Sequence, residues 1–475
     1  MKLEDLPNLK DELDTIICKE EPKFFSDEES LELYDTCFHI MEEFIKNNTK
    51  LFSEEDFEDE FLYNIEELMH SHFDYDVFYT EEAQEEMEEI ICQAMDDFFK
   101  TYIPPRSYEQ SLIIEEPDYE FINEQINYLR SKPQPQQRTK EWYEFRYNLI
   151  TASNAWKAFE NQTTQNQLIY EKCQPLNNFT IISEDTDINE VEVKLVNINT
   201  TLHWGQKYEP LSVKIYEYIY DTKIEDFGCI QHDKYSFLGA SPDGINIDPN
   251  SKRYGRMLEI KNIVNREING IPKKEYWIQM QLQMEVCDLE ECDFLETKFI
   301  EYSNEEEFIQ DTLDEVSILN DTEEEFIDHY LSKDDKMKGI ILYFHTKEGK
   351  PLYIYKPLDI IYPDDVSKWI EENIDLYESS KYCHIFMKTI YWKLEHISCV
   401  LVTRNREWFN NAIQELEDLW KIIEKERITG YEHRAPNKKD KKDLNILDLN
   451  EQTNNNGCLL KFIKSSDKIN VIKTN

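Results

Sequence analysis

Hydrophobic residues recur every three to four positions in the first quarter of the chain, which is the spacing of an amphipathic helix. In the segment LELYDTCFHIMEEFIKN, the residues on one helical face are Leu33, Cys37, Ile40, Met41, Phe44 and Ile45. The segment EEMEEIICQAMDDFF repeats the pattern. Residues 1–125 are therefore predicted to be mainly helical. The prolines of PP and SKPQPQQ break the pattern, and we place a linker at 126–137.

The pattern changes to alternation in the middle of the chain, as in half-buried strands. The segments FLGASPDGINID and MLEIKN predict strands, and EYWIQMQLQMEV predicts a helix. Further on, KGIILYFHTKEGKPLYIYKPL predicts a hairpin, TIYWKLEHISCVLVTR a strand, and NREWFNNAIQELEDLWKIIEKER a long helix ended by Gly430. We predict one domain at 138–430 with an insertion at 301–336, and a flexible polar tail at 431–475.

Charge is distributed unevenly along the chain. The 475 residues contain 99 acidic and 52 basic side chains, a net charge of −47. Residues 1–125 hold 38 acidic and 8 basic side chains, and the 301–336 insertion holds 14 and 2, whereas 126–300 hold 26 and 20. The middle is nearly neutral, so the overall acidity does not exclude nucleic-acid binding there. Three interpretations of the acidic residues 1–125 remain: a solvated helical module, a partner-docking domain, or a DNA mimic that guards a basic groove elsewhere in the chain.

Composition also excludes several classes of protein. The sequence has no run of about 18 apolar residues, and MKLEDLPNLKDELD lacks the layout of a signal peptide. Its ten cysteines are scattered without CxxC pairs, as in a reducing compartment. We therefore expect a soluble intracellular protein, located in the host cytoplasm or nucleus if the chain is viral, with no membrane partner.

Candidate chemistry lies around Asp243, Glu259 and Lys261. Residues two apart in a strand share a face, so Glu259 and Lys261 are predicted to project together while Leu258 and Ile260 pack inward. A turn over DPNSKRYG would bring Asp243 beside Glu259. Two converging carboxylates need a cation, and hard oxygen ligands suit Mg²⁺ or Mn²⁺. The adjacent lysine fits phosphodiester hydrolysis, although a chain this acidic also produces the spacing by chance.

Three further features favour the same interpretation, and each also has a plain structural explanation. Glu209 in WGQKYEP is predicted to open a helix and could supply a third carboxylate, or be a solvated acid. Arg146 and Ser153 in RTKEWYEFRYNLITASNAW suit a phosphate clamp, or a salt bridge and a helix cap. In EYWIQMQLQMEV, one helical face carries Tyr276, Gln279, Met280 and Gln283, whose amides need partners if they are buried.

Taken in order, five blocks resemble the lambda-exonuclease-like, YqaJ-type viral recombinase family of PD-(D/E)xK nucleases found in large DNA viruses. The blocks are WxxFRxxxITAS, WGxxxEP, LGASPDG, LEIK and YWxQMQLQM, and YWKLEHISCVLVTRNREWF extends the resemblance over 137–427. It implies an α/β (α+β) fold with a restriction-endonuclease-like core, in which helices flank a central mixed sheet.

The resemblance also implies roles for individual residues. Its catalytic positions are matched by Asp243, Glu259, Lys261 and Gln279. Its metal ligands, for Mg²⁺ with Mn²⁺ as a substitute, are matched by Asp243, Glu259, the Ile260 carbonyl and Glu209. Arg146 and Ser153 match the residues that hold a 5′-phosphate, and Tyr276 and Gln281 are expected to support the site from the neighbouring helix.

The implied activity is a metal-dependent 5′→3′ exonuclease that resects double-stranded DNA ends for viral recombination or repair. Its partners would be DNA ends and a single-strand annealing or replication protein, and homo-oligomerisation stays open. Two alternatives remain: a structure-specific endonuclease on the same fold, and an acidic DNA mimic or docking protein with restrained or lost activity. The basic residues expected along the DNA path are Lys207, Lys252, Arg253, Arg256, Arg266, Lys273 and Lys274.

Overall fold

The structure is a computed structural model that describes residues 23–73, 80–136, 139–176, 198, 200–312 and 331–436. Its contacts divide the chain into two units, Met1–Arg434 and Ala435–Asn475. Everything that follows concerns the first unit. The division falls four residues after 431, where the tail was predicted to begin, and the tail lies outside the described residues from 437 onward. None of the described helices combines the length and apolar character that a membrane span requires.

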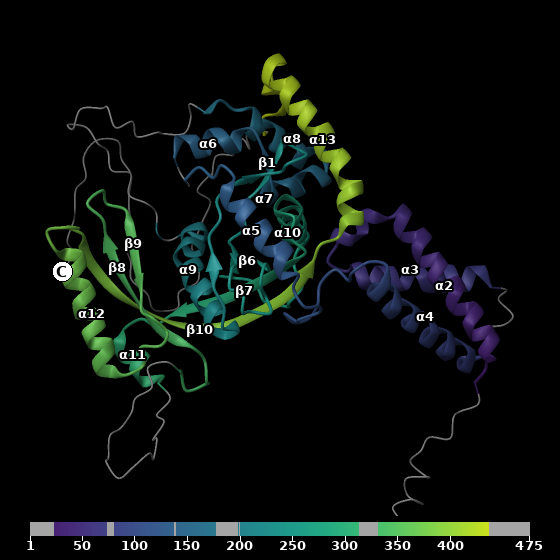
Figure 1. Ribbon diagram of the computed structural model, residues 1–475, viewed down its shortest axis with the longest axis horizontal. Helices are drawn as coiled ribbons and strands as arrows, with labels where there is room; N and C mark the ends of the chain where they lie inside the picture. The colour runs from purple at the N-terminus through teal and green to yellow at the C-terminus, as the bar shows by residue number, and fades with distance from the viewer. Residues whose placement is uncertain are drawn as a thin grey trace, which may run out of the picture. The chain divides into compact units, whose positions relative to one another are not determined.

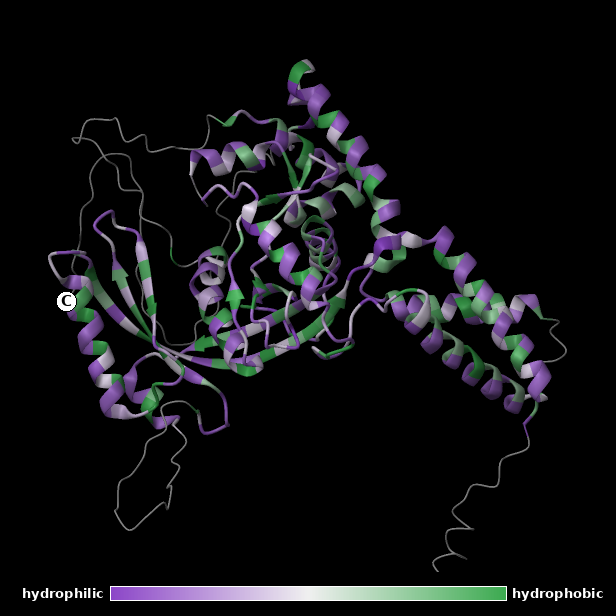
Figure 2. Cartoon of the chain, viewed as in Figure 1, coloured by the Kyte–Doolittle hydropathy of each residue, from purple (hydrophilic) through white to green (hydrophobic). Residues whose placement is uncertain are grey.

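Three helices form the beginning of the described chain: α2 (Asp27–Asn47), α3 (Phe57–His72) and α4 (Glu81–Thr101). Ser26 and Glu29 form a capping box that starts α2. The predicted apolar face of α2 is confirmed, since Leu33, Cys37, Met41 and Ile45 are buried, and Ile40 and Phe44 are partly buried. Figure 2 shows hydrophobic and hydrophilic residues alternating along these helices, as amphipathic packing requires.

The N-terminal helices are joined to the rest of the unit through Arg106. This residue is 2% exposed, donates to the Ser53 carbonyl at 3.3 Å, and accepts a hydrogen bond from Trp277 Nε1 at 2.9 Å through its own carbonyl. The predicted linker at 126–137 is wrong for its first half, because α5 (Tyr119–Ser131) continues through it and buries Ile126 and Leu129. Asp118 caps this helix, and Pro133 and Pro135 follow it only after it has ended.

The predicted α/β fold with a central mixed sheet is confirmed (Figure 1). A small sheet has the order β1-β4-β3, and a large one has the order β2-β5-β6-β7-β10-β8-β9. The β6–β7 pair is parallel and the other pairs of the large sheet are antiparallel. The strands are β1 (Ile150–Thr151), β2 (Ile224–Glu225), β3 (Ile230–Gln231), β4 (Leu238–Ala240), β5 (Gly244–Asn246), β6 (Met257–Asn262), β7 (Glu291–Glu301), β8 (Lys338–His345), β9 (Pro351–Tyr355) and β10 (Ile385–Thr403).

Helices pack on both faces of the large sheet. On one face, α9 (Thr201–Tyr220) contacts Leu258, Ile260 and Leu295 through Tyr216. On the other face lies α10 (Lys274–Cys287), and α13 (Arg406–Thr429) packs against it and ends at Gly430 as predicted. The remaining helices are α6 (Lys140–Tyr147), α7 (Ala152–Ala155), η4 (Trp156–Phe159), α8 (Gln162–Cys173), α11 (Glu305–Gln310), α12 (Pro363–Glu378) and the 3₁₀ turns η2 (Thr49–Ser53) and η6 (Glu432–Arg434).

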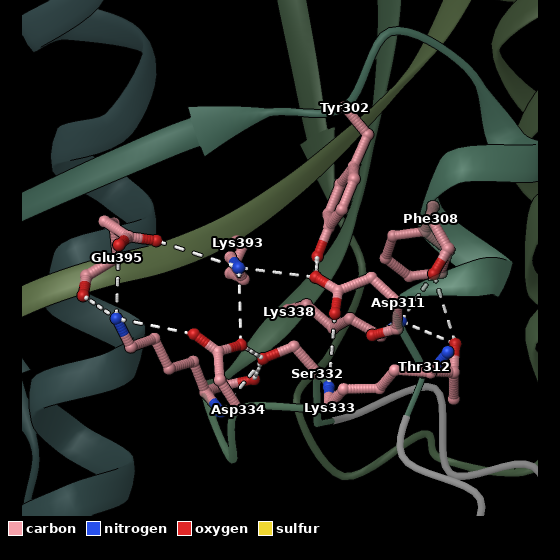
Figure 3. A network of polar contacts seen from close by, with 11 residues as sticks. Tyr302, Phe308, Asp311, Thr312, Ser332, Lys333, Asp334, Lys338, Lys393 and Glu395 are labelled. Atoms are coloured by element: carbon pink, nitrogen blue, oxygen red, sulfur yellow. Dashed lines mark hydrogen bonds and ion pairs between the residues drawn. The ribbon is translucent and has the colours of Figure 1, made fainter.

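The acidic insertion predicted at 301–336 is closed at its base by a polar network (Figure 3). Thr312 pairs with Ser332, which brings the two ends of the undescribed segment 313–330 together. Lys393 from β10 contacts Asp311 and Asp334, both at 3.3 Å. Lys338, 1% exposed, donates to the Phe308 and Asp311 carbonyls and to Thr312 Oγ1. The helix α11 lies in the described part of this insertion.

A second buried network surrounds Asp293 on β7, which is 0% exposed. Arg253 donates to its carboxylate at 2.7 Å and Arg256 at 3.1 Å. Tyr216 and Ser111 each add a hydroxyl donor at 2.6 Å. These donors come from the turn between β5 and β6, from α9 and from the segment before α5, so one carboxylate ties three parts of the chain to the sheet.

We predict that Arg256→Met lowers the free energy of unfolding by about 3 kcal/mol, because it leaves the buried Asp293 carboxylate with part of its charge uncompensated. The measurement is urea denaturation followed by tryptophan fluorescence. Lys252→Met is the matched control, since Lys252 lies in the same turn but is exposed and pairs with the exposed Glu116. Equal unfolding midpoints for the two variants would show that the Asp293 network does not stabilise the fold.

Candidate active site

Asp243 and Glu259 are brought together by the β5–β6 hairpin. Gly244 pairs with Leu258, and the Asp243 N–H donates to the Leu258 carbonyl at 3.2 Å. The Asp243 carboxylate accepts the Ile260 N–H at 2.7 Å, so it lies across the strand from Glu259. The turn requires a glycine at 255, where φ is +81° and a Cβ would lie 2.5 Å from Ile122. The predicted hairpin is therefore confirmed.

Alternation along β6 sorts its side chains between the two faces of the sheet. Leu258 and Ile260 pack inward as predicted, and there they contact Tyr216 of α9. Glu259 and Lys261 project to the opposite face, where both meet α10. This arrangement follows from the two-residue period of a strand.

Glu259 is fully buried and accepts hydrogen bonds from three side chains. Lys261 Nζ and Gln279 Nε2, the latter at 2.8 Å, donate to one carboxylate oxygen, and Gln283 Nε2 donates to the other at 2.7 Å. Gln283 also donates to the Ser241 carbonyl at 3.3 Å. The carboxylate is therefore fixed in orientation as well as compensated in charge.

Around Asp243 the acidic side chains outnumber the basic ones: Glu259 and Glu209 oppose a single lysine, Lys261, among the largest effects. Burial raises the pKa of Asp243 well above its usual range, and the charges of Glu259 and Glu209 raise it further, against the opposing effect of Lys261. Burial would lower the pKa of Lys261, but Glu259 and Asp243 outweigh that effect and hold it above its ordinary value. An additional cation would relieve the repulsion that raises the Asp243 pKa.

The donor set fits a magnesium-type ion. Among the described residues, no group of three or more His, Cys, Asp or Glu side chains could hold a metal. Mg²⁺ commonly takes one or two carboxylates and fills its other positions with water and phosphate oxygens, so Asp243 and Glu259 suffice. Glu209 does not join them in such a group, although its charge reaches Asp243. The helix opens at Thr201 rather than at Glu209, so that prediction was wrong.

Two residues of α10, Tyr276 and Gln281, were expected to support the site, and the structure places them on different sides of the helix. The Tyr276 ring lies 4.8 Å from Lys261 Nζ and contacts Phe294. Gln281 points away: it donates to the Thr403 carbonyl at 2.9 Å and accepts the Asn405 N–H at 2.7 Å. Two residues along a helix correspond to about 200° of rotation, so Gln281 cannot share a face with Gln279. Gln283 was on the predicted face but outside the predicted site.

Ser153 and Arg146 approach the same edge of the small sheet. Strands β1 and β4 run parallel with Thr151 opposite Gly239, so their carboxyl ends lie side by side. The exposed Ser153 follows the end of β1, and Asp243 follows the end of β4. The Arg146 guanidinium lies 4.6 Å from the Trp142 ring centre.

Arg146 also lies beside Cys229 and Lys172. Burial raises the pKa of the Cys229 thiol, against the opposing effect of Arg146. Burial, with Arg146 and Arg427, lowers the pKa of Lys172 to about 8. Because Cys229 precedes Ile230, which pairs with Ala240, this cationic group also lies near the end of β4.

The basic residues predicted to line a DNA path have other partners. Arg253 and Arg256 are buried against Asp293, so the prediction was wrong for these two, and Lys207 pairs with Glu301. Spacing near a motif cannot tell a cation that faces solvent from one that compensates an interior carboxylate. Arg266 pairs with Glu296, Lys274 with Glu54 and Glu160, and Lys252 with Glu116, while Lys273 is half-buried near Glu296.

Comparisons with known proteins bear on the same segment. Residues 141–290 match the YqaJ-like viral recombinase domain. An uncharacterized protein of Acanthamoeba polyphaga mimivirus is 29% identical over 335 residues, which are 66% of this chain and 56% of the mimivirus protein. The chain thus spans little more than half the length of that relative.

Two crystal structures of LHK-Exo are also similar, one of them in complex with dAMP and the other described as an alkaline exonuclease from Laribacter hongkongensis. Their sequence identities to this chain are 17% and 18%. The TM-score is 0.32 in both comparisons, with 61% of this chain and 94% of the other chain covered. The family resemblance seen in the sequence is therefore confirmed by the match of residues 141–290, which contain Asp243, Glu259 and Lys261, to the YqaJ-like viral recombinase domain.

Proposed function

We propose that the chain is a divalent-metal-dependent deoxyribonuclease whose centre is formed by Asp243, Glu259 and Lys261. The observation that carries this proposal is the meeting of the Asp243 and Glu259 carboxylates across the β5–β6 hairpin, with Lys261 bonded to Glu259 on the same face. The match to a YqaJ-like viral recombinase domain supports DNA as the substrate.

In this proposal, Asp243 and Glu259 hold Mg²⁺ or Mn²⁺, together with the Ile260 carbonyl. Such a cation supplies Lewis-acid stabilisation of the charge that develops on a phosphodiester during hydrolysis. Lys261 keeps its proton, because its pKa is held above the ordinary value, and it orients the attacking water or balances charge on the phosphate. Gln279 and Gln283 keep Glu259 in one orientation, which leaves its charge directed at the reaction centre.

We further propose a 5′→3′ exonuclease that resects double-stranded DNA ends in recombination or repair. The exposed Ser153 follows β1 at the edge where Asp243 follows β4, and Arg146 lies beside Cys229 at the start of β3, so both are available to a terminal phosphate near the carboxylates. A guanidinium and a hydroxyl are suitable donors for a phosphate. The single strand left by this reaction would be taken up by an annealing or replication protein.

Asp243→Asn and Lys261→Met are each expected to reduce Mg²⁺-dependent degradation of linear duplex DNA by at least about 100-fold, because each removes charge from the proposed centre. Asp243→Asn should also weaken Mg²⁺ binding in isothermal titration calorimetry. Asp248→Asn, in the turn of the same hairpin, is the matched control and should keep both properties. Wild-type protein that degrades no DNA with Mg²⁺ or Mn²⁺ would contradict the proposal.

Substitutions of two glutamines of α10 are expected to have different effects, one on the cleavage rate and the other on stability. Gln283→Leu is expected to lower the cleavage rate by about tenfold or more, because it frees the Glu259 carboxylate. Gln281→Leu removes bonds to Thr403 and Asn405 instead, so it should lower the unfolding midpoint and leave the rate per folded molecule close to wild type. Equal effects of both substitutions on the cleavage rate would contradict the role given to Gln283.

The direction of cleavage is tested with duplexes labelled at the 5′ or the 3′ end and with closed circular DNA. We expect early release of 5′ label, a preference for 5′-phosphorylated ends, and no cleavage of circles. Arg146→Ala should reduce the preference for phosphorylated ends by about 10-fold or more, because a charged hydrogen-bond partner is lost. Cleavage of circles at a rate equal to that of linear DNA would favour the endonuclease alternative.

A further inference from the structure

A pocket of about 300 Å³ lies where the beginning of α9 crosses β8, β9 and β10. Its aromatic walls are Trp204, Tyr343 and Tyr353, and Ile390 adds an aliphatic surface. Tyr343 and Tyr353 stack at a centroid distance of 5.1 Å, and Trp204 and Tyr353 are partly exposed while packed on the core. The volume is at the lower end of small-molecule sites, so it would admit one nucleotide unit but not a duplex.

The rim of this pocket carries more positive than negative charge, in a protein whose net charge is −47. Lys207 pairs with Glu301 and lies 4.4 Å from the centre of the Trp204 ring. Lys388, on the β10 bulge, is exposed and lines the same pocket as Lys207. Lys388 forms no salt bridge with any residue in the described part of the chain, so its charge is available to an anion.

The pocket is connected to the proposed active site through the beginning of α9. Trp204 and Lys207 of this helix line the pocket together with Tyr353 of β9, and Tyr355 on β9 donates to the Lys207 carbonyl at 2.5 Å. Asn262, the residue after Lys261, donates to the Gly205 carbonyl of the same helix at 3.3 Å. The beginning of α9 therefore contacts both the pocket and strand β6, which carries Glu259 and Lys261.

We propose that this pocket binds one nucleotide of an unpaired DNA strand, with the base against Trp204 and Tyr353 and a phosphate at Lys388. An aromatic platform beside a cation is the arrangement that recognises single-stranded nucleic acid without sequence preference. A base inside a duplex cannot reach such a wall, so the occupant must be unpaired. The inference rests on the proposed nuclease function, because only DNA processing at the carboxylates would present a single strand here.

The test measures binding of fluorescent dT₁₂ and of an abasic strand of equal length by anisotropy, without divalent metal so that no cleavage occurs. Wild type should prefer dT₁₂. Tyr353→Leu should weaken dT₁₂ binding by about fivefold or more with little effect on the abasic strand, because the loss is of stacking. Lys388→Ala should weaken both and lower the slope of log K against log salt concentration by about 0.7, the value for one phosphate contact to a single strand.

Two exposed positions outside the pocket serve as controls. Lys350→Ala, on the turn between β8 and β9, and Tyr63→Leu, on α3, should change neither affinity. The pocket is excluded if Tyr353→Leu and Lys388→Ala, both folded by circular dichroism, bind dT₁₂ as the controls do. If that happens while wild type degrades duplex ends, the nuclease proposal stands alone. If the two variants lose dT₁₂ binding but wild type cleaves no DNA with Mg²⁺, the pocket stands and the nuclease proposal fails.

Discussion

The buried Glu259 carboxylate is the constraint around which the centre of the fold is arranged. A carboxylate at 0% exposure is tolerated only when nearly every lone pair has a donor, and here Lys261, Gln279 and Gln283 supply them. The two glutamines fix the position of α10 relative to β6. The N–H of Ile260, the next residue of the same strand, holds the Asp243 carboxylate beside this buried charge.

Buried acids and buried backbone carbonyls also explain where the scarce basic residues are placed. The chain has 52 basic side chains against 99 acidic ones, yet several of them lie inside. Asp293 takes two arginines, and Lys338 is enclosed at the base of the acidic insertion (Figure 3). Each of these cations holds together segments that are distant in sequence. Cations left at the surface, such as Lys388, are therefore a better indication of a polyanionic ligand than the number of basic and acidic residues in the sequence.

Much of the fold could be predicted because it follows from local periodicity. Two-residue alternation around Leu258 and Ile260 gave the strand and the face of Glu259, and the hydrophobic spacing before Gly430 gave the last long helix. Partners distant in sequence could not be predicted this way. The inward turn of Arg253 depends on Asp293, 40 residues away, and Gln281 differs from Gln279 only by its rotation around the helix. The α5 helix was missed because prolines nearby suggested a linker.

The same distant contacts change how the acidic N-terminal helices are to be understood. Arg106 and Trp277 join these helices to α10, the helix that carries Gln279 and Gln283, and the hydrophobic cluster of α2, α3 and α4 continues into that of α13. Removing residues 1–125 would therefore take away part of the core together with the charge, and a change in DNA binding would not separate the two. Exposed acids such as Glu85 on α4 can be exchanged for glutamine without disturbing that contact, so only charge neutralisation isolates an electrostatic guard from a structural support.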